Sequence, residues 1–425
     1  MSVKLQPAEV VVVGGGPAGI AAAVCAAEAR RGARVVLVDE GFAPGGQIWR
    51  TGPGLRPPRL ARHWTERLAA SGAWVQSQTS VVDVRRDGDG FRVLCETSGQ
   101  ALTVSCGRIV LATGARERFL PFPGWTLPNV MGIGGIQALL KAGTSFRGQR
   151  IIIAGSGPLM LPVAASLTSA GGRVLMVAEQ TSAKRLALFT ASLWRSPARL
   201  GQAALLRAKF FASSYETGTW VKSAIGDKAM RSVMITNGKR ERILDCDVLC
   251  TGFGLVPNSE LARLLGCAVD GRRVVVDDVQ QTTAVGAYCA GEPTGIGGVE
   301  RSLVEGEIAG RSAMGESVSM QVRSRRAALH RYAEGLTRAF ELRDELRTLA
   351  GGDTVVCRCE DVRMRDIDPA WTSRQAKLYT RAGMGACQGR ICGAALDCLM
   401  GWTPDSVRPP IEPARVATLL DEAKL

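Results

Sequence analysis

Histidine and aromatic residues are scarce in this sequence. Only His63 and His330 occur among its 425 residues, which excludes a histidine-rich metal site and a relay of several histidines. Aromatic residues make up 5% of the chain, whereas 50 residues are glycine. This combination favours packed layers of helices and strands joined by many tight turns, so we expect an α/β fold.

Long apolar runs are also nearly absent. Residues 10–27 come closest to a signal peptide or a membrane span, but they contain four glycines and a proline and no cleavage-site pattern, which argues against both. Hydrophobic residues at 46% and charged residues at 22% are typical of a soluble globular protein of two or three domains. Twelve cysteines are too few for a disulfide scaffold. We therefore expect a cytoplasmic protein with reduced thiols, with peripheral docking to an electron acceptor at the inner membrane as an open alternative.

The chain carries a net charge of +14. Its cations are scattered, with local clusters at 56–67 and 322–347, and no basic ribbon interleaved with aromatic residues occurs. This pattern favours a solvated surface over nucleic-acid binding. The expected uses of the charge are the binding of phosphate-bearing cofactors and of an acidic partner subunit.

A glycine-rich segment near the start has the pattern of a dinucleotide site. The β-branched run Val10–Val13 indicates a strand buried on both faces. Gly14, Gly16 and Gly19 follow it at G-x-G-x-x-G spacing, and 18–31 reads as an alanine-rich helix. The three glycines suit a tight turn, close approach of the backbone to a pyrophosphate, and close packing of helix on strand. Pro17 and Ala18 complete the loop.

An acidic residue stands where such a site needs one. A second buried strand, 34–38, ends at Asp39, 20 residues after Gly19. Asp39 is placed to accept a hydrogen bond from a ribose hydroxyl, and the adjacent Glu40 could substitute. The acid alone does not distinguish FAD from NAD.

Three further segments decide in favour of FAD. They are Pro44-Gly45-Gly46-Gln47, Thr113-Gly114 after the strand 108–112, and the late segment ending in Gly291-Glu292. Together with the first glycine loop, this set resembles the two-dinucleotide-domain flavoproteins of the glutathione reductase and thioredoxin reductase superfamily, over about residues 8–315. The resemblance implies FAD binding by Gly46, Gln47, Thr113, Gly114, Gly291 and Glu292. Glu292 stands where an aspartate is usual.

A second glycine loop opens at Arg150 and is altered. The strand 151–154 precedes Gly155 and Gly157, and the strand 173–177 leads to Glu179, but Met160 replaces the third glycine. In the family this domain holds NAD(P)H. Met160 reshapes the phosphate pocket, so ATP, another nucleotide or no ligand remain alternatives. Lys184 and Arg185 could meet a phosphate or lie exposed on a helix.

The cysteines before residue 357 do not resemble a redox-active pair. Cys246 and Cys250 have only three residues between them and fall in an apolar stretch, 243–250, that reads as one strand. Buried hydrophobic packing is the favoured interpretation for them, and dithiol chemistry is not expected.

Four later cysteines have the pattern of an iron–sulfur site. Cys357 and Cys359 form a C-x-C pair, and Cys387 and Cys392 follow after 27 residues. Four thiolates suit a [2Fe–2S] cluster. Zinc is the rival, although structural zinc more often uses wider pairs. The segment 353–402 resembles the bacterioferritin-associated ferredoxin type, which ends in C-x2-C rather than the C-x4-C found here.

The combination of these parts resembles the FAD-carrying large subunit of opine and amino-acid dehydrogenase complexes. That family includes octopine and nopaline oxidases, D-hydroxyproline dehydrogenase, dye-linked proline dehydrogenase and the cyanide-forming glycine dehydrogenase. The resemblance implies a partner flavoprotein subunit that oxidises the substrate C–N bond, a small third subunit in some complexes, and a quinone or other electron acceptor. No catalytic acid–base pair is evident in this chain. The alternatives are a self-sufficient NAD(P)H-dependent reductase and a metal-storage module.

We expect four regions. Residues 1–134 and 268–317 form the FAD-binding domain, and 135–267 form a second nucleotide-binding-like domain. Residues 318–350 are a helical connector, and 351–425 comprise the [2Fe–2S] domain and a proline-rich tail.

Overall fold

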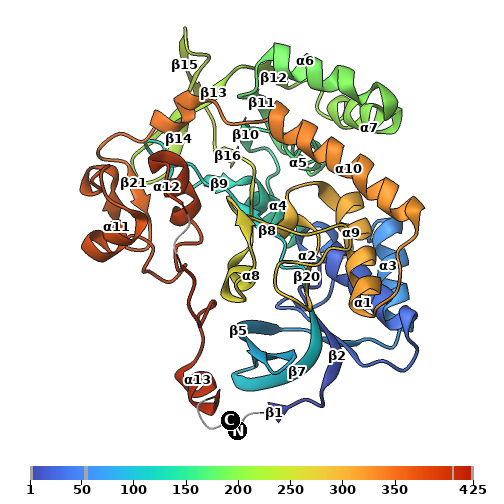
Figure 1. Ribbon diagram of the computed structural model, residues 1–425. Helices are drawn as coiled ribbons and strands as arrows, with labels where there is room; N and C mark the ends of the chain where they lie inside the picture. Colours follow the sequence, from blue (N-terminus) through green and yellow to red (C-terminus); the bar gives the residue numbers. More distant parts are fainter. Residues whose placement is uncertain (1–2, 52–55, 404–405, 423–425) are drawn as a thin grey trace. The chain divides into compact units, whose positions relative to one another are not determined.

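The computed structural model describes residues 3–51, 56–403 and 406–422, and its backbone divides into two units (Figure 1). The first unit comprises 1–116, 256–334 and 406–425, and the second comprises 117–255 and 335–405. The chain therefore passes four times from one unit to the other. The strands β8 (Ala115–Glu117) and β17 (Leu255–Pro257) lie at two of these crossings.

The first unit is built on an eight-stranded sheet in which a parallel half and an antiparallel half share β7. The order is β4-β3-β2-β7-β6-β5, and β1 and β20 also pair with β7. Strands β5, β6 and β7 are antiparallel, and the other pairs are parallel. The bounds are β1 Val3–Lys4, β2 Ala8–Val13, β3 Val35–Val38, β4 Trp74–Gln76, β5 Thr79–Asp87, β6 Gly90–Thr97, β7 Gln100–Leu111 and β20 Ala287–Cys289.

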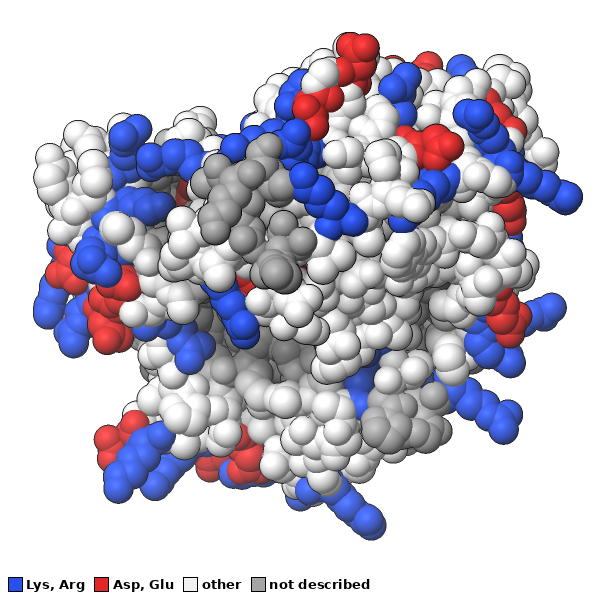
Figure 2. All heavy atoms as spheres, turned by 90° about the horizontal axis from the view of Figure 1, so that it is seen from below, with Lys and Arg blue, Asp and Glu red and all other residues white. Residues whose placement is uncertain are grey.

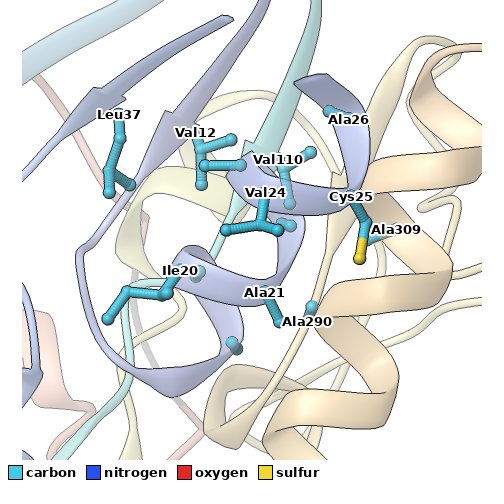
Figure 3. Packing of buried hydrophobic residues seen from close by; sticks show 14 of the residues in the cluster. Val12, Ile20, Ala21, Val24, Cys25, Ala26, Leu37, Val110, Ala290 and Ala309 are labelled. Atoms are coloured by element: carbon cyan, nitrogen blue, oxygen red, sulfur yellow. The ribbon is translucent and has the colours of Figure 1, made fainter. Parts of the chain in front are cut away.

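Helix α1 (Pro17–Ala29) fills the space between this sheet and helix α9 (Gly298–Ala313). Figure 3 shows Ile20 and Val24 of α1 beside Val12, Leu37 and Val110 of the sheet, and Ala309 of α9 beside Cys25. Small side chains let the two helices approach closely. A Cβ added at Gly306 would lie 2.1 Å from the carbonyl oxygen of Ala18, so only glycine fits there.

The other elements of the first unit are one helix of 12 residues, α3, and several short segments. The chain tail returns to this unit, where the backbone N–H of Arg415 and the hydroxyl of Thr418 both donate to the carboxylate of Glu96. The bounds are α2 Gly46–Trp49, α3 Arg59–Ala70, α8 Glu260–Leu264, β18 Val269–Asp270, β19 Arg273–Val274, η2 Glu292–Thr294 and α13 Val416–Glu422.

The second unit contains a fully parallel five-stranded sheet of order β12-β11-β10-β16-β9. A three-stranded antiparallel sheet, β13-β14-β15, follows β12 in the chain. The bounds are β9 Val130–Gly132, β10 Arg150–Gly155, β11 Arg173–Glu179, β12 Ser214–Thr217, β13 Trp220–Gly226, β14 Met230–Thr236, β15 Glu241–Asp245 and β16 Val248–Gly252; the helices are α4 Ile133–Lys141, α5 Met160–Ser169, α6 Ala183–Ser192, η1 Leu193–Arg195 and α7 Pro197–Ala208. The two sheets with their helices confirm the expected α/β class with two Rossmann-like domains.

The cysteine-rich segment of the second unit has a small core of its own. Val356, Ile367, Ala376 and Leu396 are buried there beside Cys357 and Cys392. Its elements are η3 Asp344–Thr348, β21 Val355–Cys357, β22 Val362–Arg363, η4 Met364–Asp366, α11 Ser373–Thr380 and α12 Cys392–Met400. Helix α10 (Met320–Ala339) precedes this segment in the chain.

The expectation of one strand over 243–250 is wrong. Strand β15 ends at Asp245 and β16 begins at Val248, so Cys246 lies between two strands of different sheets. Its side chain is nevertheless fully buried, and its sulfur lies 3.9 Å from that of Met230. An apolar run by itself does not show where one sheet ends and the next begins.

No helix in the described part of the chain is long and apolar enough to cross a bilayer. On the face drawn in Figure 2, Lys and Arg side chains are scattered and are interspersed with Asp and Glu side chains. That face therefore carries no continuous basic surface of the kind that tracks a nucleic-acid backbone.

Candidate cofactor sites

The first glycine loop has the shape of a phosphate cradle. Gly14 has a φ of +103°, and a Cβ there would lie 2.3 Å from the carbonyl oxygen of Ala112. A Cβ at Gly19 would lie 1.7 Å from the carbonyl oxygen of Gly14. At Gly16, by contrast, an added Cβ would have no atom within 4 Å. Two glycines thus permit close backbone contacts, while the third leaves open space beside the start of α1.

Helix α1 points its N-terminus at this open space. It begins at Pro17, and no side chain caps its first turn. The N–H groups of a first turn have no partner within the helix and carry partial positive charge. A pyrophosphate is a fitting acceptor for them, and the donor set therefore fits FAD.

Asp39 is fixed to the glycine loop and remains accessible. Its carboxylate accepts hydrogen bonds from the backbone N–H groups of Gly15 and Gly41. Its side chain is half-buried, whereas Glu40 is exposed. Asp39 therefore has the placement expected of a ribose-binding acid.

The loop containing Gly46 and Gln47 packs against the first glycine loop. The N–H of Gly45 donates to the carbonyl oxygen of Gly15 at 2.6 Å. Gly46 has a φ of +56°, and a Cβ there would lie 3.0 Å from the Cα of Gly16. The structure thus brings these two predicted segments together.

Thr113 and Gly114 are held by Asn258, which lies in the range 135–267 expected for the second nucleotide-binding-like domain. The Thr113 hydroxyl donates to the carbonyl oxygen of Asn258 at 2.6 Å, and the Asn258 amide donates back to the carbonyl oxygen of Thr113. Arg116 bonds both the Asn258 side chain and Glu260. Burial raises the pKa of Glu260, but the Arg116 guanidinium outweighs it and holds the pKa below its usual range.

Gly291 and Glu292 lie against α1. Gly291 has a φ of +83°, and a Cβ there would lie 2.7 Å from the Cβ of Ala18. Burial raises the pKa of the Glu292 carboxyl, and Arg301 offsets part of this effect. A neighbouring group able to donate a hydrogen bond, such as a ribityl hydroxyl, would favour the charged form.

A buried ion pair in α9 supports this segment, and the sequence pattern did not reveal it. Arg301 donates to Glu305 at 2.6 Å, and both side chains are almost fully buried. Glu305 also accepts from the N–H of Gly291 and the hydroxyl of Thr294. The i,i+4 spacing of Arg301 and Glu305, shortly after Gly291-Glu292, is the sequence pattern that could have predicted this ion pair.

We expect Glu305→Ala to destabilise the protein by about 3–5 kcal/mol, because it leaves the buried Arg301 charge without its carboxylate partner. Glu307→Ala, on the same helix, removes a more exposed pair with Arg311 and should cost less than about 1 kcal/mol. Urea unfolding of both variants tests this, and equal losses would contradict it.

The second glycine loop departs from this pattern. Helix α5 begins at Met160, three residues after Gly157, whereas α1 begins directly after Gly16. The first turn of α5 is therefore displaced from the loop that would carry a phosphate. The N–H of Gly157 is also occupied, because it donates to Glu179 at 2.9 Å.

Glu179 is fully buried, unlike its counterpart Asp39. Its carboxylate accepts from the N–H groups of Gly157 and Thr181. Burial raises the pKa of the Glu179 carboxyl, and these hydrogen bonds offset part of the effect. Gln180 and Thr181, which follow it, are almost fully buried as well.

Residues 339–343, which fall within the expected connector 318–350, cover the end of β11. The Ser156 hydroxyl donates to the carbonyl oxygen of Phe340. The Thr181 hydroxyl donates to that of Ala339, and the Gln180 amide donates to that of Glu341. The N–H of Arg343 donates to the Gln180 side chain. The guanidinium of Arg343 stacks on Trp220 at 3.8 Å. These contacts cover the end of β11 beside the second glycine loop.

Lys184 and Arg185 do not enter this loop. Both are exposed on α6, and the Arg185 guanidinium lies 3.9 Å from the Glu341 carboxylate. The exposed-helix interpretation therefore fits them better than the phosphate interpretation.

The four late cysteines line one cavity of about 210 Å³. Cys357 at the end of β21 and Cys392 at the start of α12 are buried, while Cys387 is half-buried and Cys359 is exposed. A Cβ added at Gly385 would lie 2.2 Å from the Cβ of Cys359, so glycine allows the two cysteine loops to meet.

Backbone N–H groups surround one of these sulfurs. Burial raises the pKa of the Cys387 thiol, but hydrogen bonds from the N–H groups of Ile391, Gly389 and Arg390 and from Cys359 bring it below its usual value. Such donors stabilise a thiolate, which is the form that binds metals.

The rest of the cavity wall includes residues from far earlier in the chain. Phe119 and Trp125 are the earlier residues, and they line the cavity together with Arg358 and Ile391 from the cysteine loops. The indole N–H of Trp125 donates to the carbonyl oxygen of Val355 at 2.6 Å, and the Arg358 guanidinium lies 5.6 Å from its ring. Within residues 3–51, 56–403 and 406–422, no three His, Cys, Asp or Glu side chains come close enough to hold a single metal ion.

The remaining cysteines are separate from this cavity. Burial raises the pKa of Cys95 to about 12 and that of Cys250 well above its usual value. Cys398 is half-buried on α12 and does not line the cavity. None of the 12 cysteines forms a disulfide in the structure.

A family model described as pyridine nucleotide-disulphide oxidoreductase matches residues 8–306. The chain belongs to this family. Membership implies FAD as a cofactor and an oxidoreductase as the class of protein, and the expected relation to the glutathione and thioredoxin reductase class is confirmed.

Two curated relatives match along most of their length. The chain is 34% identical to hydrogen cyanide synthase subunit HcnB of Pseudomonas aeruginosa, covering 90% of each chain. It is 31% identical to a subunit of opine oxidase from Agrobacterium tumefaciens, covering 97% of this chain and 91% of that one. The predicted relation to subunits of these two kinds of complex is confirmed.

Solved structures agree on the fold. L-proline dehydrogenase from P. horikoshii matches 99% of this chain and 80% of its own, with a TM-score of 0.69 and 19% identity. Thioredoxin reductase from T. acidophilum matches 74% of this chain and 100% of its own, with a TM-score of 0.59 and 21% identity.

Proposed function

We propose that this chain is the FAD- and [2Fe–2S]-carrying subunit of a hetero-oligomeric dehydrogenase for an amino acid, imino acid or opine. In this role it receives electrons from a substrate-oxidising partner subunit, itself a flavoprotein, and passes them to a quinone or other acceptor. The cyanide-forming glycine dehydrogenase is one member of this class that it could serve. We place the complex in the cytoplasm, with a small third subunit in some forms.

The observation that carries this proposal is the convergence of Cys357, Cys359, Cys387 and Cys392 on one cavity in a chain of a flavoprotein family. Four thiolates complete the ligand set of a [2Fe–2S] cluster. The C-x-C spacing of Cys357 and Cys359 favours a cluster over a single zinc ion, because structural zinc sites more often use wider cysteine pairs. The Arg358 guanidinium would offset its negative charge.

The chain's residues would orient two redox groups and set their potentials. The first glycine loop, the N-terminus of α1 and Asp39 would hold FAD, which accepts two electrons, while a [2Fe–2S] cluster transfers one at a time. Hydrogen bonds to the sulfur of Cys387 raise the potential of such a cluster, because they stabilise added negative charge. Burial of Cys357 and Cys392 limits water access.

Oxidation of the substrate C–N bond is assigned to the partner. His330 is half exposed and lies 3.9 Å from Glu334 on α10, and His63 is exposed beside Trp64 on α3. Exposed contacts of this kind are typical of helix surfaces rather than of a substrate acid–base site. The relatives are named as subunits of larger assemblies, which supports a division of labour between chains.

The covered second glycine loop argues against a self-sufficient NAD(P)H-dependent reductase. Glu179 is fully buried and residues 339–343 occupy the rim. A nucleotide would have to displace at least four hydrogen bonds and the stacking of Arg343 on Trp220. Reducing equivalents therefore enter from the partner.

The purified chain alone should show flavin and iron–sulfur absorbance but oxidise amines at a negligible rate, since its substrate site lies in the partner. Co-expression with the partner should restore flavin reduction by one amino acid or opine out of a panel. Anaerobic absorbance spectra measure this. Strong amine turnover by the isolated chain would overturn the division of labour.

Cys392→Ser should lower the content of iron and acid-labile sulfide from about two of each per chain to near zero. Cys398→Ser, six residues later on the same helix, should leave both unchanged, because Cys398 does not line the cavity. Elemental analysis and electron paramagnetic resonance of the reduced protein provide the measurement. Stoichiometric zinc in place of iron would refute the cluster.

NADH and NADPH should fail to bleach the flavin of the isolated chain, because the rim of the second glycine loop is covered. Dithionite serves as the control, since it should bleach the flavin fully. Rapid bleaching by either nicotinamide nucleotide in a stopped-flow experiment would restore the reductase alternative.

A further inference from the structure

One side of helix α11 carries a row of cations. Arg374, Lys377 and Leu378 lie on the same side of the helix, because residues three and four apart share a face. All three side chains are exposed, and Leu378 has an exposed fraction of 66%. Arg381 continues the row, since it caps α11 and its N–H donates to the carbonyl oxygen of Lys377 at 3.0 Å.

Arg381 joins this row to the loop that carries Cys359. Its guanidinium donates to the carboxylate of Glu360 at 2.7 Å, and Glu360 directly follows Cys359. The N–H of Met384 donates to the carbonyl oxygen of Arg381 at 2.9 Å. A Cβ added at Gly385 would lie 2.2 Å from the Cβ of Cys359. Direct contacts thus link the row of cations, the exposed Met384 and the exposed Cys359.

These residues form what we call the α11 face, and the sequence around it has an excess of positive charge. Residues 369–396 contain no Asp or Glu. They contain four cations, which are Arg374, Lys377, Arg381 and Arg390. Of the two acids next to Cys359, Glu360 is paired with Arg381 and Asp361 is exposed. The loop 383–389, which meets Cys359 at Gly385, has no charged side chain. An uncharged centre with a charged rim is typical of a protein–protein contact.

The composition of the α11 face favours a transient partner over a permanent subunit. Permanent interfaces often bury more than about 2,000 Å² and are strongly apolar, whereas electron-transfer encounters use less than about 1,200 Å². Leu378 and Met384 are the large apolar side chains of this face, beside three cations. An acidic partner is complementary to these cations, which would steer its association.

We propose that the α11 face docks an acidic electron-transfer protein, which takes electrons from the cluster one at a time. This inference rests on the proposed function, in which Cys357, Cys359, Cys387 and Cys392 hold a [2Fe–2S] cluster. Each step oxidises the reduced cluster by one electron and reduces one oxidised metal centre of the partner, and no covalent bond forms or breaks. The electron leaves on the side of Cys359, because that cysteine is exposed whereas Cys357 and Cys392 are buried.

Stopped-flow oxidation of the chain with its flavin and cluster tests the proposal. The protein is reduced anaerobically with dithionite and mixed with plastocyanin, an acidic copper protein, or with cytochrome c, a basic haem protein. The rate with plastocyanin should fall at least about tenfold as salt is added, because salt screens the attraction. The rate with cytochrome c should rise under the same change. A plastocyanin rate that does not respond to salt would overturn the proposal.

Two pairs of substitutions with the same change in net charge locate the contact. Arg374→Glu with Lys377→Glu should lower the plastocyanin rate at low salt at least about tenfold. Lys228→Glu with Arg325→Glu, at two exposed positions outside the face, should lower it less than about twofold. Equal losses in the two pairs would show that only net charge matters and would refute docking on the α11 face.

Cross-linking provides a readout that does not depend on electron transfer. A carbodiimide joins carboxylates to lysine, and Lys377 is the one lysine in residues 353–402. Plastocyanin should cross-link to Lys377 of the oxidised protein, and mass spectrometry identifies the site. If Lys377 instead cross-links to a co-purifying subunit, the face belongs to a permanent interface and the proposal is wrong.

Iron analysis separates this proposal from the proposed function. The unaltered chain and both pairs of variants should contain about two iron atoms per chain and give the same electron paramagnetic resonance signal after reduction. A chain without iron would refute both proposals. An iron-loaded chain whose Arg374→Glu, Lys377→Glu variant reacts normally with plastocyanin would refute the docking face alone.

Discussion

The close approach of backbone to backbone around α1 is the constraint on which the first unit depends. Gly19 lets the helix contact the turn at Gly14, and Gly306 lets α9 contact the carbonyl of Ala18. With any larger side chain at these positions, the helix would move away from the sheet. The N-terminus of α1 would then no longer point at the open space beside Gly16. The same glycines are thus needed both for the packing of α1 and for the position of its N-terminus beside Gly16.

The two glycine loops show how one motif can serve two purposes. Asp39 directly follows the second strand of its βαβ unit and Glu179 ends the second strand of the other, and both accept backbone N–H groups. Asp39 is half-buried and remains accessible, while Glu179 is fully buried and the next two residues, Gln180 and Thr181, bond residues 339–343. In the second case the acid bonds the N–H groups of Gly157 and Thr181 within its own unit.

Local patterns predicted much of this architecture, and long-range contacts were beyond their reach. The strand, glycine loop and acid around Gly14 occur in order along the chain, as do the four cysteines. The positions of Trp125 beside Val355 and of Asn258 beside Thr113 depend on pairs more than 140 residues apart. The contacts of residues 339–343 with Gln180 and Thr181 could not be predicted for the same reason. The break at Cys246 was missed because the apolar side chains of Ile243 and Leu244 read as part of the same run as β16, although β15 is mostly exposed.

The return of residues 406–425 to the first unit has a mechanical consequence. The cysteine-bearing segment is followed in the chain by a tail that belongs to the first unit, and this tail is held by the bonds of Arg415 and Thr418 to Glu96. Two tethers restrict how far such a segment can swing, because both loop closures must be satisfied together. If the four cysteines hold the proposed cluster, a segment joined to the chain at both ends would move that cluster less than a single flexible arm would.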